Sequence, residues 1–269
     1  MVRRNSILSG LIASLVLVST LRAQNVKPSD AEIEKFLTTG RILSSNLIGQ
    51  GVTKASRATL SLAGRVHDAQ MQSINMKLND LYDPAGKPVQ WRDDYKHNIA
   101  AYKLDRLLML NMVPPSVERP MGKQRAAFTW WADDVMMMES DRERKNIEPP
   151  DQEAWKRQLS VATTFDQLIY NVDRNTGNLL ITKDWRLVLI DHTRAFSPNP
   201  RLMDRPNFDR CSSRLLSALR GLDKGKLTTA LSPYLTAPQI DGMLMRRDLI
   251  VKHFDKLIQE KGEAAVLFP

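Results

Sequence analysis

Alternating apolar and polar positions mark the first half of the chain as rich in strands. Residues 57–62 and 66–74 alternate in this way on either side of Gly64, which predicts two antiparallel strands joined by a turn. Residues 111–119 read as an extended stretch, and 124–131 are strand-like. These segments predict a small β-sheet.

Two helices interrupt this strand-rich half. The apolar spacing of residues 30–39 predicts a short helix, and that of residues 95–110 a longer one capped by Asp93 or Asp94. The proline- and glycine-containing segment 79–92 before the second helix predicts a loop.

Helical periodicity dominates the second half. A charged, methionine-rich segment, 132–151, reads as a connector, with its methionines expected to fill gaps in a core. Thr236 and Gln239 form a capping-box pattern at the start of the last helix. The elements expected after the connector are a helix over 152–170, a hairpin over 178–190, and helices near 211–223 and 236–261.

This order of elements predicts an α+β fold with two lobes and a cleft between them. The N-lobe is expected over 24–131 and carries the sheet and the bridging helix 95–110. The C-lobe is expected over 132–269 and is mainly helical, with a polar loop and hairpin over 170–196.

Residues 1–23 have the pattern of a targeting segment. Arg3 and Arg4 precede an apolar stretch, 7–18, that is short for a membrane span, and Ala23 is a plausible cleavage position. We therefore expect export to the periplasm or the exterior, with an uncleaved membrane anchor as the alternative.

The composition narrows the classes of ligand only slightly. A formal net charge of +9 suits anionic ligands without choosing among nucleotides, lipid headgroups and nucleic acid, and no basic stripe interleaved with aromatic residues signals nucleic-acid binding. The single cysteine excludes an intrachain disulfide, and the four histidines are too scattered for a zinc site.

Three polar residues of the segment 170–196 carry the candidate chemistry. Asp173 precedes Asn178 by five positions, and Asp191 ends the apolar strand 186–190. Phosphoryl transfer needs oxygen ligands for a metal ion and a group that orients the attacking hydroxyl, and these residue types supply both. The alternative is an ordinary turn, because "DRNTGN" is rich in residues that bond their own backbone.

The segments "FDQLIYNVDRNTGNLLI" and "WRLVLIDHTRAF" together resemble the core of atypical kinases of the phosphatidylinositol 3-/4-kinase-like kind. The resemblance extends with less force from Ile48 to Phe196. It implies a protein-kinase-like fold, ATP and Mg²⁺ (or Mn²⁺) as cofactors, and transfer of a phosphoryl group to a hydroxyl of a protein, lipid or sugar.

By the same resemblance, Asp173 would be the catalytic base, Arg174 an organiser of its loop, and Asn178 and Asp191 the metal ligands. Gly49 and Gly51 of "IGQGVT" would belong to a glycine loop over the phosphates.

Two positions depart from the kinase pattern. The strand lysine that grips the phosphates is expected at Gln72, and its glutamate partner on the bridging helix at Asn98. Replacing both charges avoids leaving one of them unpaired. Lys54 is the first candidate for restoring the missing positive charge, and Lys77 the second.

Three hypotheses follow. The first is an exported, Mg-ATP-dependent, kinase-like phosphotransferase, which the triad Asp173, Asn178 and Asp191 favours. The second is a pseudokinase that binds nucleotide or serves as a scaffold, which Gln72 and Asn98 favour. The third is a non-enzymatic envelope protein, which predicts that the triad does not converge.

Overall fold

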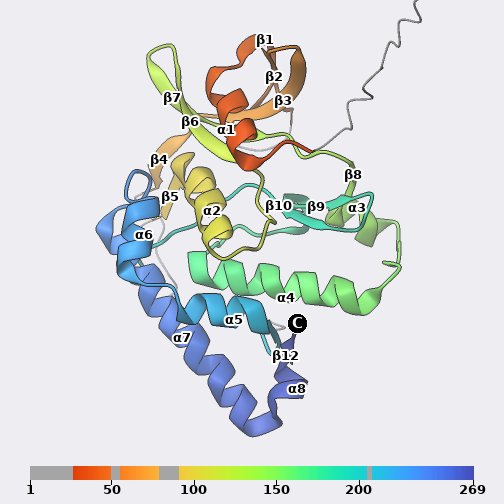
Figure 1. Ribbon diagram of the computed structural model, residues 1–269, viewed down its shortest axis with the longest axis vertical. Coiled ribbons are helices and arrows are strands. Elements are labelled where there is room, and N and C mark those ends of the chain that lie inside the picture. Colours follow the sequence, from red (N-terminus) through yellow and green to blue (C-terminus); the bar gives the residue numbers. More distant parts are fainter. Residues whose placement is uncertain (1–26, 50–54, 79–90, 205–207) are drawn as a thin grey trace, which may run out of the picture.

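A computed structural model describes residues 27–49, 55–78, 91–204 and 208–269. A β-sheet lobe lies at one end of the molecule, a mainly helical lobe at the other, and a small three-stranded sheet between them (Figure 1). The α+β, two-lobed architecture is therefore the one predicted. No helix within the described ranges is long and apolar enough to cross a membrane.

The N-lobe is a five-stranded antiparallel sheet covered by one helix, in the order β1-β2-β3-β7-β6. Helix α1 buries Phe36 and Leu37 against Leu60 and Phe128 of the sheet. At the β2–β3 turn Ala63 and Gly64 both have positive φ, as in the tight turns that suit twisted hairpins. The bounds are α1 Asp30–Thr39, β1 Arg41–Leu47, β2 Ser56–Leu62, β3 Arg65–Gln72, β6 Ser116–Met121 and β7 Gln124–Trp130.

Helix α2 (Lys96–Leu107) lies between the N-lobe sheet and the helical lobe (Figure 1). A two-stranded ribbon, β4 (Asn75–Leu78) with β5 (Trp91–Asp94), leads into it. The helix is buried on nearly every side, including its polar residues His97 and Asn98. Burial of polar side chains on this scale requires partners in both lobes.

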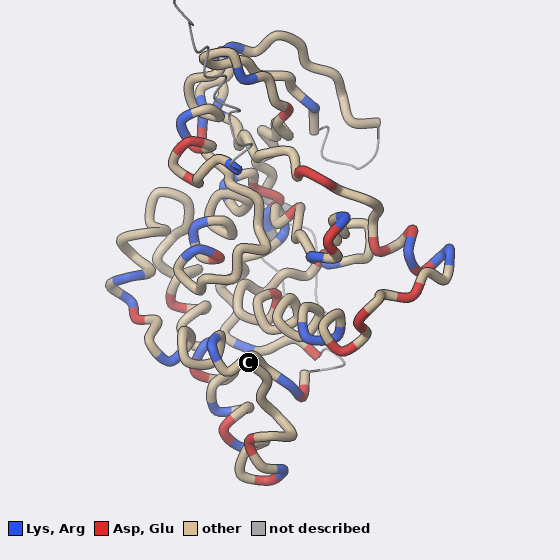
Figure 2. Tube along the Cα trace, turned by 45° about the vertical axis from the view of Figure 1, so that its right-hand side comes forward, with Lys and Arg blue, Asp and Glu red and all other residues tan. Residues whose placement is uncertain are grey.

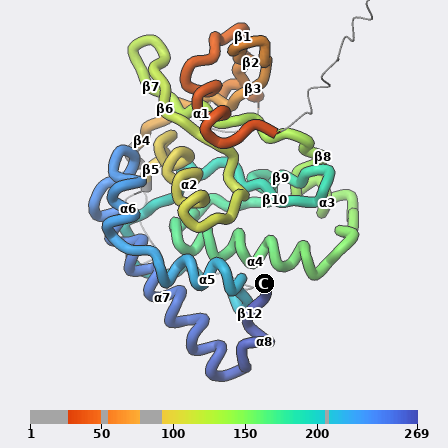
Figure 3. The backbone as a smooth tube through the Cα atoms, viewed as in Figure 1, coloured from red at the N-terminus to blue at the C-terminus, as the bar shows by residue number. Residues whose placement is uncertain are grey.

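The C-lobe packs its helices around one large apolar core that includes Phe165, Phe196 and Phe254. Its small sheet has the order β10-β9-β8, and the long helix α7 runs along the outside before the chain returns beside α5 (Figure 3). The bounds are β8 Val135–Met138, α3 Glu139–Arg144, α4 Gln152–Ile169, η1 Thr176–Asn178, β9 Leu179–Thr182, β10 Leu187–Leu189, β11 Cys211–Ser212, α5 Ser213–Arg220, α6 Lys224–Leu231, α7 Ala237–Lys261, α8 Glu263–Val266 and β12 Leu267–Phe268.

Local sequence patterns predicted the positions of several elements correctly. The hairpin expected over 178–190 is β9 and β10, and the capping box of Thr236 and Gln239 begins α7. The boundary between lobes at residue 131 stays a prediction; β7 ends at Trp130 and β8 begins at Val135.

The predicted end of the bridging helix at residue 110 was wrong. Helix α2 stops at Leu107, and Met109 and Asn111 adopt positive φ. The buried carboxylate of Asp105 turns the chain there, because its Oδ1 accepts hydrogen bonds from the backbone of Met112 and Val113 at 2.9 and 3.1 Å. A tertiary hydrogen-bond acceptor thus overrides the helical periodicity.

Several other predicted element boundaries were also wrong. The loop expected through residue 92 already contains β5 at its end, and the connector 132–151 contains β8 and α3. The helix expected over 211–223 is β11 followed by α5, and α6 comes as an addition. Strand β1 was not predicted, because all seven of its residues are exposed and it shows no apolar alternation.

Candidate functional site

A cavity of about 590 Å³ lies between the lobes. Ile48 and Ala55 line it from the N-lobe, and Met137 and Met138 line it from β8. The polar end is formed by residues that sequence analysis selected, Asn178 and Asp191, together with Gly177. The cavity therefore combines apolar walls with oxygen-bearing side chains, as small-molecule sites do; Gln70, Thr129, Ser140 and Asp141 also line it.

The methionine-rich segment is thus part of the cavity as well as of the packing. Met137 and Met138 are partly buried, whereas Met136 is 41% exposed, so the expectation that all three fill a core was wrong for Met136. Strand β8 has a register shift between Val135 and Met137 in its pairing with β9, which leaves Met136 out of the regular pairing.

The loop after α4 is shaped by its own polar side chains. Tyr170 ends the helix in the left-handed region, and the buried Asn171 accepts a hydrogen bond from the backbone of Asp173 at 3.2 Å. Asn178 closes the loop, because its amide nitrogen donates to the carbonyl oxygen of Asp173 at 3.2 Å. The local turn bonding expected as the alternative is therefore present in this loop. It uses the side-chain nitrogen of Asn178, and the side-chain oxygen of Asn178 takes no part in that bond.

Arg174 is buried beneath the same loop. Its guanidinium group forms a two-point ion pair with Asp166 of α4, at 2.9 and 3.2 Å. It also donates to the carbonyl oxygens of Asn178 and Ile190, at 2.9 and 2.7 Å, and to Nε2 of His192 at 2.9 Å. One planar side chain thereby connects the loop, the end of β10 and the segment that carries Asp191.

Asp191 follows β10 with a φ of 54°, an uncommon conformation for a residue with a side chain. Burial raises the pKa of its carboxyl group above the usual range; hydrogen bonding to Thr193 opposes this rise, and the negative charges of Asp93 and Asp173 add to it. Neighbouring carboxylates that repel one another are stabilised by a cation.

The residues present therefore fit a divalent cation. Asp191 and Asn178 supply oxygen donors at one end of the cavity, and oxygen is the ligand atom that Mg²⁺ and Mn²⁺ prefer. Among the described residues no group of three or more His, Cys, Asp and Glu gathers as a metal site.

Gln72 and Asn98, which the sequence paired, are in contact. Asn98 of α2 donates to Oε1 of Gln72 of β3 at 2.8 Å, and both side chains are buried. The carbonyl oxygen of the Asn98 side chain accepts the backbone N–H of His192 at 2.8 Å. Two neutral side chains therefore connect β3, α2 and the residue after Asp191, in the place expected for a lysine–glutamate ion pair.

The expected glycine loop is only partly described. Gly49 is exposed, whereas Gly51 and Lys54 lie outside the described residues. The backbone of Lys77 pairs with Arg92 in the β4–β5 ribbon. The roles predicted for Lys54 and Lys77 therefore stay predictions.

Two charged residues of the site were missed by sequence reasoning, Asp93 and Arg194. Nε and Nη1 of Arg194 donate to Oδ2 of Asp93 at 3.0 Å and to Oδ2 of Asp173 at 3.2 Å. Asp93 and Asp94 read as alternative helix caps, and Asp94 does accept the backbone N–H of Lys96 at 3.0 Å. The bond of Asp93 to Arg194 leaves no mark in the local sequence pattern.

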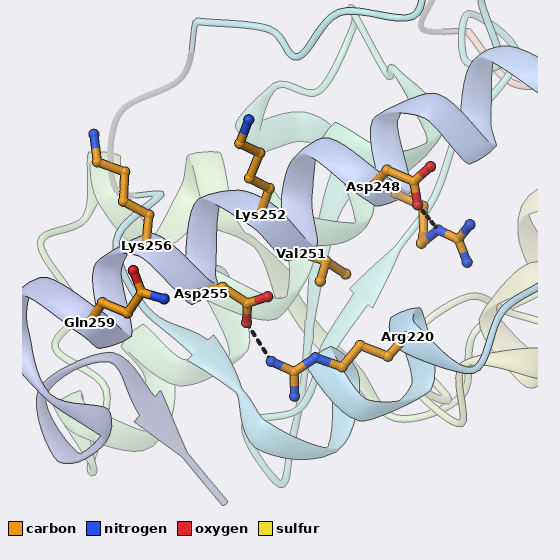
Figure 4. A pocket seen from close by; sticks show the side chains of 8 residues that line it. Arg220, Asp248, Val251, Lys252, Asp255, Lys256 and Gln259 are labelled. Carbon is orange, nitrogen blue, oxygen red and sulfur yellow. Dashed lines mark hydrogen bonds and ion pairs between the residues drawn. The ribbon is translucent and has the colours of Figure 1, made fainter.

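Charged side chains of both signs are spread over the rest of the described chain. Lys and Arg alternate with Asp and Glu along both lobes (Figure 2). A groove of about 690 Å³ between α5 and α7 is lined by charged side chains, in which Arg220 pairs with Asp255 and Arg247 with Asp248, while Lys252 and Lys256 add positive charge (Figure 4).

Comparison with known proteins places the fold. No protein-family model matches the sequence, and no curated protein sequence matches it. A solved structure of hydra Fam20 with sugar superposes with a TM-score of 0.68 at 16% identity, over 88% of this chain and 91% of that one. The Golgi casein kinase with Mn/ADP bound gives 0.64 at 14% identity, over 88% and 78%.

A bacterial kinase also shares the architecture. The proinflammatory kinase CtkA of Helicobacter pylori superposes with a TM-score of 0.52 at 9% identity, over 83% of this chain and 98% of that one. At these identities the similarity establishes the fold alone. The chain has an atypical protein-kinase-like fold, and the cavity lies between its two lobes.

Proposed function

We propose that this protein is a kinase-like phosphotransferase that uses ATP with Mg²⁺, or with Mn²⁺, and transfers the γ-phosphoryl group to a hydroxyl. The observation that carries the proposal is the shared cavity of Asn178 and Asp191, with Asp173 bonded to Asn178 beside it. A structural neighbour, the Golgi casein kinase, was solved with Mn/ADP bound, which supports a nucleotide and a divalent cation as ligands.

In this proposal the residues divide the work. Asn178 and Asp191 would hold the metal. The nucleotide would supply the phosphoryl group, and the metal would neutralise the charge of the phosphates. Asp173 orients the acceptor hydroxyl and accepts its proton. Arg174, which is buried and bound at five points, keeps the loop in place without touching the substrate.

A pseudokinase is the second candidate function. The neutral Gln72–Asn98 pair favours it, because lysine and glutamate at these positions grip and align the phosphates in protein kinases. A structural envelope protein predicts dispersed side chains at 173, 178 and 191; Asn178 and Asp191 line one cavity and Asn178 bonds the backbone of Asp173, which favours the two kinase hypotheses.

The finer points of the proposal rest on the sequence. The likeness to the phosphatidylinositol 3-/4-kinase-like kind comes from the motifs of 165–196, and the proposal of export, or of membrane association through an anchor, comes from residues 1–23. The acceptor class, whether protein, lipid or sugar, is left to experiment.

One experiment separates the candidate functions. The wild type, Asp173→Asn and Asp191→Ala are compared for transfer of labelled γ-phosphate and for the rise in melting temperature caused by ATP with Mg²⁺; Asp248→Asn, on the exposed surface of α7, is the control. A ligand present at 100 times its Kd raises the free energy of unfolding of the protein that binds it by about 2.7 kcal/mol, and the melting temperature rises with it. We expect that stabilisation in the wild type and in Asp173→Asn, and none in Asp191→Ala.

The outcomes are distinct. Transfer by the wild type that Asp173→Asn loses supports the phosphotransferase. Nucleotide stabilisation without transfer to water or to any hydroxyl acceptor supports the pseudokinase. No stabilisation at millimolar ATP, with either metal, would overturn both.

A further inference from the structure

The end of β5 and the first turn of α2 contact the segment after Asp191 at four points. Asp93 bonds Arg194, the backbone N–H of Asp94 donates to the carbonyl oxygen of Thr193 at 3.0 Å, and Nδ1 of His97 donates to the same oxygen at 2.8 Å. The fourth contact is the hydrogen bond from the backbone of His192 to Asn98. We call these paired residues, 93–98 and 192–194, the α2 clamp.

The clamp is anchored in both lobes. Asn98 is tied to Gln72 of the N-lobe sheet, and His97 receives a hydrogen bond at its Nε2 from Gln239 of α7 at 3.1 Å. Both anchoring side chains of α2 are at most 4% exposed. A buried set of connected polar contacts holds one arrangement of the chain rather than several.

Arg194 extends the clamp to Asp173. It donates to Asp93 and to Asp173 through different nitrogens of one rigid guanidinium group, at 3.0 and 3.2 Å. The Asp93 side chain is 4% exposed, and within the described residues its other oxygen, Oδ1, has no hydrogen-bond partner. The buried charge of Asp93 therefore depends on Arg194, which fixes the guanidinium group in position.

The neutral pair of Gln72 and Asn98 gives the ion pair of Asp93 and Arg194 a structural role in this region. In protein kinases a lysine–glutamate ion pair joins the sheet to the bridging helix and must be in place for activity. Here Gln72 and Asn98 make that connection without charge, and the ion pair of the region has moved to Asp93 and Arg194. The charged connection thereby runs from Asp93, at the end of β5, through Arg194 to Asp173.

We infer that Asp93 and Arg194 are positioning residues that hold Asp173 in its working orientation, in place of the missing lysine–glutamate pair. This inference rests on the proposed function, and it assigns roles to two residues, Asp93 and Arg194, that the resemblance to kinases left without one. Arg194 restrains one oxygen of the Asp173 carboxylate, because its bond is to Oδ2.

The test uses the full chain with Asp93→Asn, Arg194→Gln, Arg194→Lys and the double variant Asp93→Asn/Arg194→Gln. Arg186→Gln is the matched control, because its Nε pairs with Asp184 at 2.7 Å on the exposed hairpin. Turnover, the Kd for ATP with Mg²⁺, and amide hydrogen exchange of the peptide that contains residues 170–178 are measured on each variant.

We expect turnover to fall at least about tenfold in Asp93→Asn and Arg194→Gln, while the nucleotide Kd changes less than about threefold. The double variant should be no slower than the slower single variant, because the two residues act as one unit. Arg194→Lys should restore part of the turnover, and hydrogen exchange over 170–178 should speed up in the glutamine and asparagine variants alone.

The inference is overturned if exchange over 170–178 is unchanged in folded Arg194→Gln. It is also overturned if turnover is unaffected, or if the effects of the two single variants multiply. Failure of the proposed function has a different signature: the wild type neither binds nucleotide nor transfers phosphate, whereas the exchange measurement still reports on the clamp.

Discussion

At the scale of single residues, Arg174 determines the shape of the loop that carries Asp173. Its side chain is only 8% exposed. Its buried positive charge is paired with Asp166, and its guanidinium group also donates hydrogen bonds to three further acceptors. A carboxylate left without such a partner in the interior is strongly destabilising. The loop geometry therefore depends on one guanidinium group rather than on the turn residues "NTG" alone.

Replacing Arg174 by alanine should therefore lower the free energy of unfolding by about 3–5 kcal/mol, the loss typical of a broken buried ion pair. Urea denaturation measures this change. Arg186→Ala is the comparison, because that arginine forms an exposed pair and should change stability by less than about 1 kcal/mol. Equal effects of the two substitutions would show that Arg174 does not organise the loop.

At the scale of elements, β3 and α2 meet through Gln72 and Asn98. The two side chains are 2% and 4% exposed, so a charge introduced at either position alone would lie in the interior without its partner. Neutral hydrogen bonds thus join α2 to β3, whereas the charged pair of Asp93 and Arg194 lies where β5 leads into the helix.

The variants Gln72→Lys and Asn98→Glu should each be destabilised by about 2–4 kcal/mol, because each buries an unpaired charge. The double variant restores opposite charges across the contact. Its decrease in the free energy of unfolding should therefore be smaller than the sum of the decreases in the two single variants by about 0.5–3 kcal/mol. A double-mutant cycle of denaturation midpoints provides the measurement. Strict additivity would mean that the two positions do not interact.

At the scale of the whole molecule, two separate apolar cores support the lobes. One lies between α1 and the five-stranded sheet, and the larger one fills the helical lobe and contains Cys211, which is fully buried. Burial raises the pKa of the Cys211 thiol to about 12. The thiolate, which is the reactive form, is accordingly rare at neutral pH.

Cys211 should therefore report on the opening of the larger core. We expect reaction with a thiol reagent at pH 8 to be negligible in the native protein and complete in denaturant, with a rate that follows the unfolding of the helical lobe. A colorimetric thiol assay over a urea series measures it. Rapid reaction without denaturant would show that the core around β11 opens locally.

Local chemistry allowed much of the fold to be predicted before the structure. The turn at Gly64, the capping box at Thr236 and the apolar strand before Asp191 are each governed by neighbours within a few residues, and each appears where expected. Strand β1 and the early end of α2 escaped prediction, because the first is exposed along its length and the second depends on the buried Asp105.

The sequence by itself determined the two-lobed α+β order, the spacing of Asp173, Asn178 and Asp191, and the replacement of two charges at Gln72 and Asn98. These follow from periodicity and motif spacing, which act along the chain. Only the tertiary structure showed that Arg194 bridges Asp93 and Asp173, residues 101 and 21 positions away. Charge pairing depends on distance in space, and the packing of α2 against the segment after Asp191 sets that distance.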